Sequence, residues 1–329
     1  MSDANLILLA DIGATNLRFA LCESAAVPLR AGSIRRYRAA DHSSLSEAAA
    51  RYLQDVGARP SHAVFAIAGR VDGCEVKITN LPWTVSAAEV AQTLGLDSVR
   101  LVNDFAAQSR SLPLLQAADL EVLGTPPAPL LDGRIDRCVA VVGPGTGLGA
   151  GALLLRGGQA IVLETEGGHL GFAPGTDEED AILHYLRREF GRVSNERLLC
   201  GSGLVNLYGA LCQIRTSPRL ATTPERVMQS ALDGSDATAV RAVDLFAELL
   251  GDVAGDLVLA CGAWDGVFLG GGLLEPLLPV LRRGGFRARF EAKGRLAATM
   301  ARTPTVAMRH PNTGLLGAAG IALDARAAR

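Results

Sequence analysis

The chain has 329 residues, with 32 Lys and Arg against 34 Asp and Glu, so its formal net charge is −2. This length is ample for about two domains and excludes a small disulfide-stapled module. Hydrophobic residues make up 49% and charged residues 20%, which excludes wholesale disorder and fibrous structure. Because no excess of positive charge would draw the chain to nucleic acid or anionic lipid, we expect a small-molecule ligand and no nucleic-acid partner.

The six cysteines, at positions 22, 74, 138, 200, 212 and 261, form neither a CxxC pattern nor a compact disulfide framework. This spacing favours reduced thiols in the cytoplasm. The first apolar run ends at Asp11 and has no Lys or Arg before it, so we predict no export signal. The longest uncharged stretch, Cys138 to Leu155, is broken by glycine and proline, so we expect no membrane partner either.

The first predicted element is a β-hairpin over Leu6 to Leu21, in which two short apolar runs flank a polar turn. Asp11 closes the first run, and a Gly-Ala-Thr-Asn turn follows. The Gly and Ala let backbone N–H groups approach a phosphate, while the Thr and Asn add hydrogen-bond donors. The Asp11 carboxylate is suited to Mg²⁺, directly or through water. The alternative is a turn whose Asp and Asn serve turn chemistry alone.

Polar residues around positions 79–89 come next. Thr79 and Asn80 are polar candidates at a cleft edge, and the nearby Trp83 is interpreted as a packing anchor. Ser86 and Glu89 have the spacing of a capping box, which predicts a helix start.

Asn103 and Asp104 follow an apolar pair at the end of a predicted strand that opens onto a helix. Asp104 is open to two interpretations. It is either an N-cap of that helix or a general base that accepts the proton of an attacking hydroxyl in phosphoryl transfer. A domain boundary is predicted between Ser111 and Pro129, where a Pro-Pro pair occurs and periodicity is weak.

A second hairpin is predicted over Cys138 to Leu155, with the turn sequence GPGTGLG and Thr146 as its lone hydroxyl. The turn is not a P-loop, because no GK[ST] follows, and the segment after it is not the helix of a dinucleotide fingerprint. The hairpins begin 132 positions apart, which indicates two structurally related lobes. Two such turns would bind a polyphosphate from two sides of a cleft.

Three polar residues in the following segment are candidate polyol ligands. Glu166 and His169 are separated by two glycines, which disfavour a helical Glu-x-x-His metal site. On a tight loop they could instead bind adjacent hydroxyls of a polyol. Glu196 would add a third ligand, or it is a helix-start charge near Ser194.

Helices are predicted through the second half of the chain. Thr176 begins one as a second capping-box hydroxyl, Pro224 occupies the first position of another, and Asp236 to Leu257 is long and amphipathic. Gly270 to Gly272 follow a short apolar strand. They either let an adenine or ribose lie against the backbone or form a plain strand-to-helix turn. Strands that alternate with helices predict an α/β architecture.

Taken together and in this order, the motifs ADIGATN, ITNLPW, VNDF, GPGTGLG, EGGH, SNERLLCGSGLVNLY and FLGGG resemble those of the bacterial glucokinases, in the hexokinase–actin superfamily. The resemblance runs from Leu6 to about Gly320. It implies an α/β fold of two ribonuclease-H-like, actin-like ATPase lobes around a central cleft. The implied small lobe is 1–114 plus 309–329, with a returning helix near its end, and the implied large lobe is 115–308.

The resemblance also implies the site residues and ligands. ATP is assigned to Ala10, Asp11, Ile12, Gly13, Ala14, Thr15, Asn16, Thr146, Gly147, Gly270, Gly271 and Gly272. Glucose is assigned to Asn80, Asn103, Asp104, Glu166, His169 and Glu196. Asp104 would be the catalytic base of ATP-dependent phosphorylation of D-glucose at O6, with Mg²⁺ near Asp11, in a homodimer. The alternatives are a kinase of another hexose and an actin-like ATPase that is not a kinase.

Overall fold

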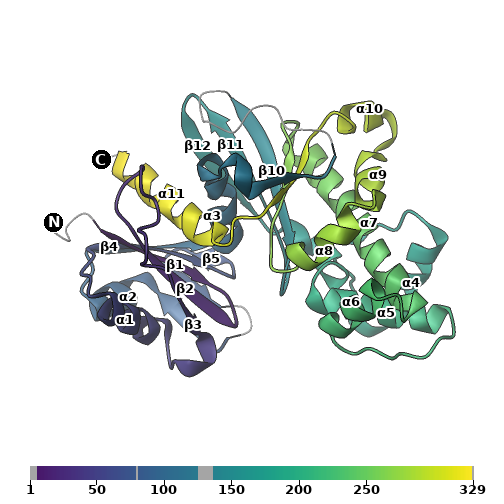
Figure 1. The fold of residues 1–329 in the computed structure, drawn as a ribbon, viewed down its shortest axis with the longest axis horizontal. Coiled ribbons are helices and arrows are strands. Elements are labelled where there is room, and N and C mark those ends of the chain that lie inside the picture. The colour runs from purple at the N-terminus through teal and green to yellow at the C-terminus, as the bar shows by residue number, and fades with distance from the viewer. Residues whose placement is uncertain (1–5, 79–80, 125–135, 328–329) are drawn as a thin grey trace. The chain divides into compact units, whose positions relative to one another are not determined.

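A computed structural model describes residues 6–78, 81–124 and 136–327 (Figure 1). The chain divides into two compact units. Unit 1 comprises Met1–Gln116 and His310–Arg329, and unit 2 comprises Ala117–Arg309. Each unit has a central β-sheet with helices packed against it, so the α/β class predicted from the sequence is confirmed.

The sheet of unit 1 has the strand order β3-β2-β1-β4-β8. Its strands are β1 (Ile7–Ile12), β2 (Asn16–Cys22), β3 (Arg35–Arg38), β4 (His62–Ile67) and β8 (Ser98–Asn103). Strands β1 and β2 form the predicted hairpin, and β1, β4 and β8 run parallel. Their register aligns Ile12 with Ile67 and Ile67 with Asn103. The first turn and the Asn103–Asp104 pair therefore lie at the same edge of this sheet, the one formed by the carboxyl ends of the parallel strands β1, β4 and β8.

Helices cover both faces of the unit 1 sheet, because successive residues of β1 and β2 are buried on opposite faces. One face packs on α1 (Leu45–Val56) and α2 (Ala87–Leu94), and the other on α3 (Asp104–Ser111) and α11 (Thr313–Ala327) (Figure 1). Gly317 permits the crossing of α3 and α11, since a Cβ there would lie 1.6 Å from the carbonyl oxygen of Ala107. The end of the chain thus completes the unit that its beginning starts.

Three short strands form a separate small sheet in unit 1, in the order β5-β6-β7. They are β5 (Val71–Asp72), β6 (Glu75–Lys77) and β7 (Thr84–Ser86). Ser86 ends β7, paired with Glu75, and α2 starts at the next residue. Its side chain makes no cap hydrogen bond, so the capping box predicted at Ser86 and Glu89 is wrong.

The sheet of unit 2 has the order β12-β11-β10-β13-β14-β9. Its strands are β9 (Leu120–Val122), β10 (Arg137–Pro144), β11 (Leu148–Arg156), β12 (Gln159–Thr165), β13 (Val267–Leu269) and β14 (Thr305–Met308). Three antiparallel strands, β12, β11 and β10, are followed by the parallel strands β13 and β14. The same arrangement occurs in unit 1, which confirms that the two lobes are structurally related.

The helices of unit 2 bury a large apolar core against this sheet. They are α4 (Asp177–Phe190), α5 (Gly201–Ile214), α6 (Pro224–Leu232), α7 (Ala237–Cys261), α8 (Leu274–Leu281), α9 (Gly285–Glu291) and α10 (Ala297–Met300). Thr176, Thr223 and Asp236 cap α4, α6 and α7 through side-chain oxygens that accept backbone N–H groups. These helix starts agree with the prediction, although α7 continues to Cys261.

Candidate active site

The first turn, in unit 1, is closed by a hydrogen bond from Gly13 N to Asn16 O at 3.0 Å. Beside it, Arg18 Nη1 donates to Asp11 Oδ2 at 2.8 Å, across the register that pairs these two residues. The Asp11 carboxylate also lies against the start of α11, because a Cβ on Gly314 would be 2.6 Å from its Cγ. Asp11 is thus held from two sides, by a guanidinium and by a helix that leaves room only for glycine.

Asn103 and Asp104 both lie at the start of α3, where Asn103 is the N-cap residue and Asp104 is the first helical residue. Asn103 is the N-cap of α3: its Oδ1 accepts from Phe105 N at 2.9 Å and Ala106 N at 3.1 Å, while its Nδ2 donates to Gly69 O. Asp104 is the first residue of the helix, is half-buried, and accepts from Phe105 N through Oδ1 at 3.0 Å. The N-cap interpretation therefore belongs to Asn103, and the Asp104 carboxylate sits at the positive end of the helix dipole.

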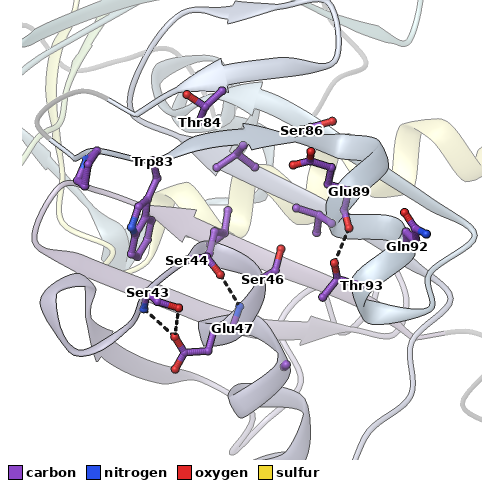
Figure 2. Close-up of a pocket in the computed structure, with 15 residues that line it drawn as sticks. Ser43, Ser44, Ser46, Glu47, Trp83, Thr84, Ser86, Glu89, Gln92 and Thr93 are labelled. Carbon is purple, nitrogen blue, oxygen red and sulfur yellow. Dashed lines mark hydrogen bonds between the residues drawn. The ribbon is translucent and has the colours of Figure 1, made fainter.

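Asn80 and Thr79 lie outside the described residues. Trp83 packs against the unit 1 core, in agreement with its interpretation as an anchor. It also borders a cavity of about 660 Å³ between the first turns of α1 and the length of α2 (Figure 2). Hydroxyls and carboxylates line this cavity, among them Ser46, Ser86 and Glu89, and none of the predicted site residues that the structure describes does.

The second turn, in unit 2, packs directly on the glycine run after β13. Gly270 N donates to Val142 O at 3.0 Å, and Leu273 N donates to Pro144 O at 3.0 Å. A Cβ on Gly143 would lie 2.6 Å from the Gly270 carbonyl group, and one on Gly271 would lie 2.4 Å from Pro144 O. The structure therefore brings the predicted phosphate turn and the predicted adenosine motif into backbone contact, which only glycine permits. Pro144 takes part in that contact through its carbonyl oxygen.

Glu196 is tied to the second turn. Leu148 N donates to Glu196 Oε2 at 2.9 Å, and a Cβ on Gly147 would collide with the same oxygen. Glu196 lies in the 3-10 turn Asn195–Arg197 and is half-buried. It is thus more than a helix-start charge, because its carboxylate fixes the start of β11.

Glu166 and His169 lie on a loop that packs on the same strand start. His169 Nε2 is 3.8 Å from Glu166 Oε2, and both side chains are more than half exposed. A Cβ on Gly168 would lie 2.0 Å from Leu148 O, so the EGGH loop presses against the residue that Glu196 binds. Backbone bonds join the two loops, Gly171 pairing with Ser194 and Asn195 N donating to Leu170 O. Unit 2 therefore gathers Thr146, Glu166, His169 and Glu196 around the start of β11.

Two contacts of the site were missed by sequence reasoning. Arg18 is a partner of Asp11, and Gly314 supports that carboxylate from α11. A strand register would have found Arg18, since it places residues 11 and 18 opposite each other. Among the described residues, no cluster of three or more His, Cys, Asp or Glu side chains could hold a metal ion. No helix in the described ranges is long and apolar enough to cross a membrane.

Comparison with known proteins identifies relatives over nearly the whole chain. A family model described as glucokinase matches residues 8–325. A glucokinase of Stenotrophomonas maltophilia is 51% identical over 321 residues, which are 97% of this chain and 95% of that protein.

Solved structures agree with this fold. A glucokinase from an Antarctic psychrotroph has a TM-score of 0.83 and 32% identity, with 96% of this chain and 98% of that one covered. A ROK family glucokinase from Streptomyces griseus, solved with glucose and AMPPNP, has a TM-score of 0.64 and 19% identity over 96% of this chain and 98% of that one. At that identity the likeness shows the fold alone, which is the two-lobe actin-like ATPase fold.

Proposed function

This chain belongs to the glucokinase family, and from that membership together with the geometry of both units we propose that it transfers the γ-phosphoryl group of ATP to O6 of D-glucose. The products are glucose 6-phosphate and ADP. One observation carries the proposal furthest: the register of β1, β4 and β8 puts the first phosphate turn and Asp104 at the same sheet edge. Ligands of α/β proteins bind at the carboxyl ends of parallel strands.

Asp104 is the general base in this proposal. Phosphoryl transfer needs an aligned hydroxyl and a proton acceptor within hydrogen-bond reach, more than it needs covalent help. The Asp104 carboxylate is half-buried rather than packed into the core, and its position at the start of α3 is fixed by the Asn103 cap. It accepts the proton of the 6-hydroxyl as that oxygen attacks the γ-phosphorus.

The sugar hydroxyls are assigned to acceptors from both units. Asn103 and Asp104 belong to unit 1, as does Asn80, which lies outside the described residues. Glu166, His169 and Glu196 come from unit 2, where two joined loops hold them around one strand start. Carboxylates and an imidazole on tight loops suit a neutral polyol, since each can bind a hydroxyl without a countercharge.

The nucleotide is assigned to the two turns and the glycine run. Backbone N–H groups of the first turn beyond Gly13, whose N–H already donates to Asn16 O, and of Thr146 and Gly147 would bind phosphate oxygens, next to residues 10–12 at the end of β1. Gly270, Gly271 and Gly272 would pack against the nucleoside. The close backbone contact between the second turn and this run supports the assignment, because it forms one continuous glycine-lined surface.

Mg²⁺ fits the Asp11 carboxylate. Oδ2 is taken by Arg18, whereas Oδ1 accepts no hydrogen bond from another described residue. One or two carboxylates plus substrate phosphates are the usual protein share of a Mg²⁺ site. When bound, the ion would neutralise charge on the β- and γ-phosphate oxygens.

An assay of ADP release with glucose, mannose, fructose, galactose and N-acetylated sugars tests the substrate. We expect glucose to have the highest kcat/KM. Another hexose preferred by more than about tenfold, a gap of roughly 1.4 kcal/mol, would identify a different hexose kinase. ADP release that no sugar accelerates would instead identify an ATPase.

Asp104→Asn tests the base. We expect kcat to fall by about 10²- to 10⁴-fold, while the affinity for glucose stays within a few-fold, because the amide keeps a hydrogen bond but accepts no proton. Asp97→Asn is the control, since Asp97 is exposed and lies just before the opposite end of the same strand, β8. A variant at position 104 that keeps a near-normal kcat contradicts the assignment.

A further inference from the structure

The edge strand β3 carries a row of arginines beside the first phosphate turn. Its register with β2 places Arg36 opposite Arg18 and Arg38 opposite Asn16. Directly opposed residues of antiparallel strands project from the same face, and so do residues two apart along one strand. Arg36 and Arg38 therefore project from the face that also carries Asp11, which pairs with Arg18.

The main chain brings this end of β3 up to the turn itself. Ala39 N, the donor just after Arg38, binds Thr15 O at 3.0 Å. Thr15 and Asn16 are two of the four residues of the first phosphate turn. The row of arginines thus begins with Arg38 beside the turn and continues with Arg36 along the edge strand β3.

The positive charge of this row is not balanced by the protein. Arg18 has Asp11 as its ion-pair partner, and its buried Nε has no hydrogen-bond acceptor. In the part of the chain that the structure describes, the exposed side chains of Arg36 and Arg38 make no ion pair or hydrogen bond. Like charges directly opposite each other destabilise a sheet, so the pair formed by Arg18 and Arg36 has a cost that a bound anion would remove.

The other face of β3 is different. Arg35 Nη1 donates to the carbonyl oxygens of Gly32 and Ile34 at 2.7 and 2.9 Å. Tyr37 donates to Asp55 at 2.8 Å. The side chains of Arg35 and Tyr37 thus make hydrogen bonds within the unit, whereas those of Arg36 and Arg38 make none to another described residue.

We propose that Arg36 and Arg38, next to Arg18, form an anion subsite for the phosphate chain of the phosphoryl donor. The naming of that donor rests on the proposed function, whereas the subsite itself rests on the register and charge of β3. Guanidinium groups bind phosphate oxygens in pairs and hold their charge at any physiological pH. The subsite would extend the backbone donors of the first turn by two cationic side chains.

The double variant Arg36→Ser/Arg38→Ser tests the subsite in the intact enzyme. We expect the KM for ATP to rise by about tenfold and the KM for glucose to stay within twofold, because charged hydrogen bonds to the donor alone are lost. Raising the salt concentration should increase the KM for ATP of the wild type more than that of the variant. The melting temperature should not fall, since removal of opposed like charges relieves repulsion.

Two further variants separate the subsite from a general charge effect. Arg35→Ser removes one cation from the same strand but from the opposite face, so its KM for ATP should remain normal. Arg36→Lys/Arg38→Lys keeps the charge without the planar fork and should recover part of the affinity. A KM for ATP that rises equally in the Arg35 variant, or stays within twofold in the double serine variant, overturns the proposal.

Binding of tripolyphosphate in the absence of sugar, measured by calorimetry, tests the anion subsite independently of the proposed kinase activity. We expect the double serine variant to bind it at least about fivefold more weakly than the wild type. If no sugar is phosphorylated and this difference persists, the kinase assignment fails while the subsite stands. Equal affinities in the two proteins contradict the subsite. Inorganic phosphate bound as tightly as tripolyphosphate contradicts a subsite for a phosphate chain.

Discussion

The two glycine-containing turns occupy equivalent places in two related sheets, yet they are built differently. The first turn is surrounded by charge, with Asp11 and Arg18 beside it and Asp104 on the same sheet edge. The second is surrounded by backbone, since Gly143 and Gly271 pack against the opposing main chain. Glu196 is the one proposed site carboxylate bonded to it, through Leu148 N.

In the proposed function, this difference would divide two tasks between the two related α/β units. Reaction at a phosphoryl group needs charge and a proton acceptor, which unit 1 would supply. Close approach to a nucleotide needs bare backbone, which unit 2 would supply. Substitutions should therefore lower the stability of the two units for different physical reasons. Trp83 lies in unit 1 and Trp264 in unit 2. Unfolding of unit 1 can therefore be followed by Trp83 fluorescence in a Trp264→Phe background, and unfolding of unit 2 by Trp264 fluorescence in a Trp83→Phe background.

The largest effect on stability is expected from Gly317→Ala in unit 1. The added methyl group would lie 1.6 Å from Ala107 O, so α3 and α11 must separate. We expect the unfolding free energy of unit 1 to fall by about 3 kcal/mol, followed by Trp83 fluorescence in urea. Trp264 should report an unchanged unit 2.

Gly320→Ala is the matched control, one turn further along the same helix. A Cβ there meets the side chain of Arg110, which can move, rather than backbone. Its stability should stay within about 1 kcal/mol of the wild type. Equal losses in the two variants would show that helix crossing is not the cause.

A smaller effect is expected from Gly271→Ala in unit 2. The residue has φ +85°, and its Cβ would lie 2.4 Å from Pro144 O. The unfolding free energy reported by Trp264 should fall by about 2 kcal/mol, because backbone strain and a steric clash combine. Gly272→Ala is the control, since nothing lies within 4 Å of its Cβ position and its φ is not in the left-handed range. A loss of the same size at position 272 would argue against the backbone contact.

The smallest effect is an acid sensitivity that differs between the units. In unit 2, burial would raise the pKa of Glu178, but hydrogen bonds from Arg241 and Arg215 outweigh it and hold the pKa below 4.5. Burial would also raise the pKa of Asp236. Hydrogen bonds from Tyr208 and from two backbone N–H groups outweigh this effect and hold that pKa below 3.8. A lowered folded-state pKa gives stability that is present above the ordinary value and is lost as pH falls through the lowered one.

The urea midpoint of unit 2 should therefore decrease as the pH falls below about 4.5, by an amount equivalent to about 1 kcal/mol. Asp236→Asn, which keeps an acceptor oxygen for the backbone N–H groups, should flatten this dependence. Unit 1 should change less, because its one carboxylate with a clearly lowered pKa among the described residues, Glu47, lies on the surface, where solvent screens its interactions. A steeper loss in unit 1 would reverse the comparison.

The sequence predicts the buried parts of this fold well. Both hairpins follow from short apolar runs around glycine turns, and Thr176, Pro224 and Asp236 mark real helix starts. The edge strand β3 has no such signal, because its sequence RRYR is mainly exposed and lacks apolar alternation. The pairing of Arg18 with Arg36 depends on that strand and so could not be predicted.

At Ser86 the sequence predicts the helix start correctly, since α2 begins at Ala87, but it predicts a side-chain cap that does not form. Ser86 has the spacing of a capping residue, but it pairs with Glu75 in the small sheet and its hydroxyl makes no cap hydrogen bond. At Asp104, the local pattern leaves base and N-cap equally open. Only the structure shows that Asn103 takes the capping role.

Helix α11 has a consequence for synthesis of the protein. Unit 2 is one continuous stretch of chain, whereas unit 1 lacks α11 until the last residues are translated. While the ribosome is still occupied, the face of the first sheet that α3 and α11 share is covered by α3 alone, and unit 2 can already be complete. Cotranslational chaperones would thus be needed most by the segment made first, and a nonsense mutation before position 313 would leave a finished second unit joined to an unfinished first.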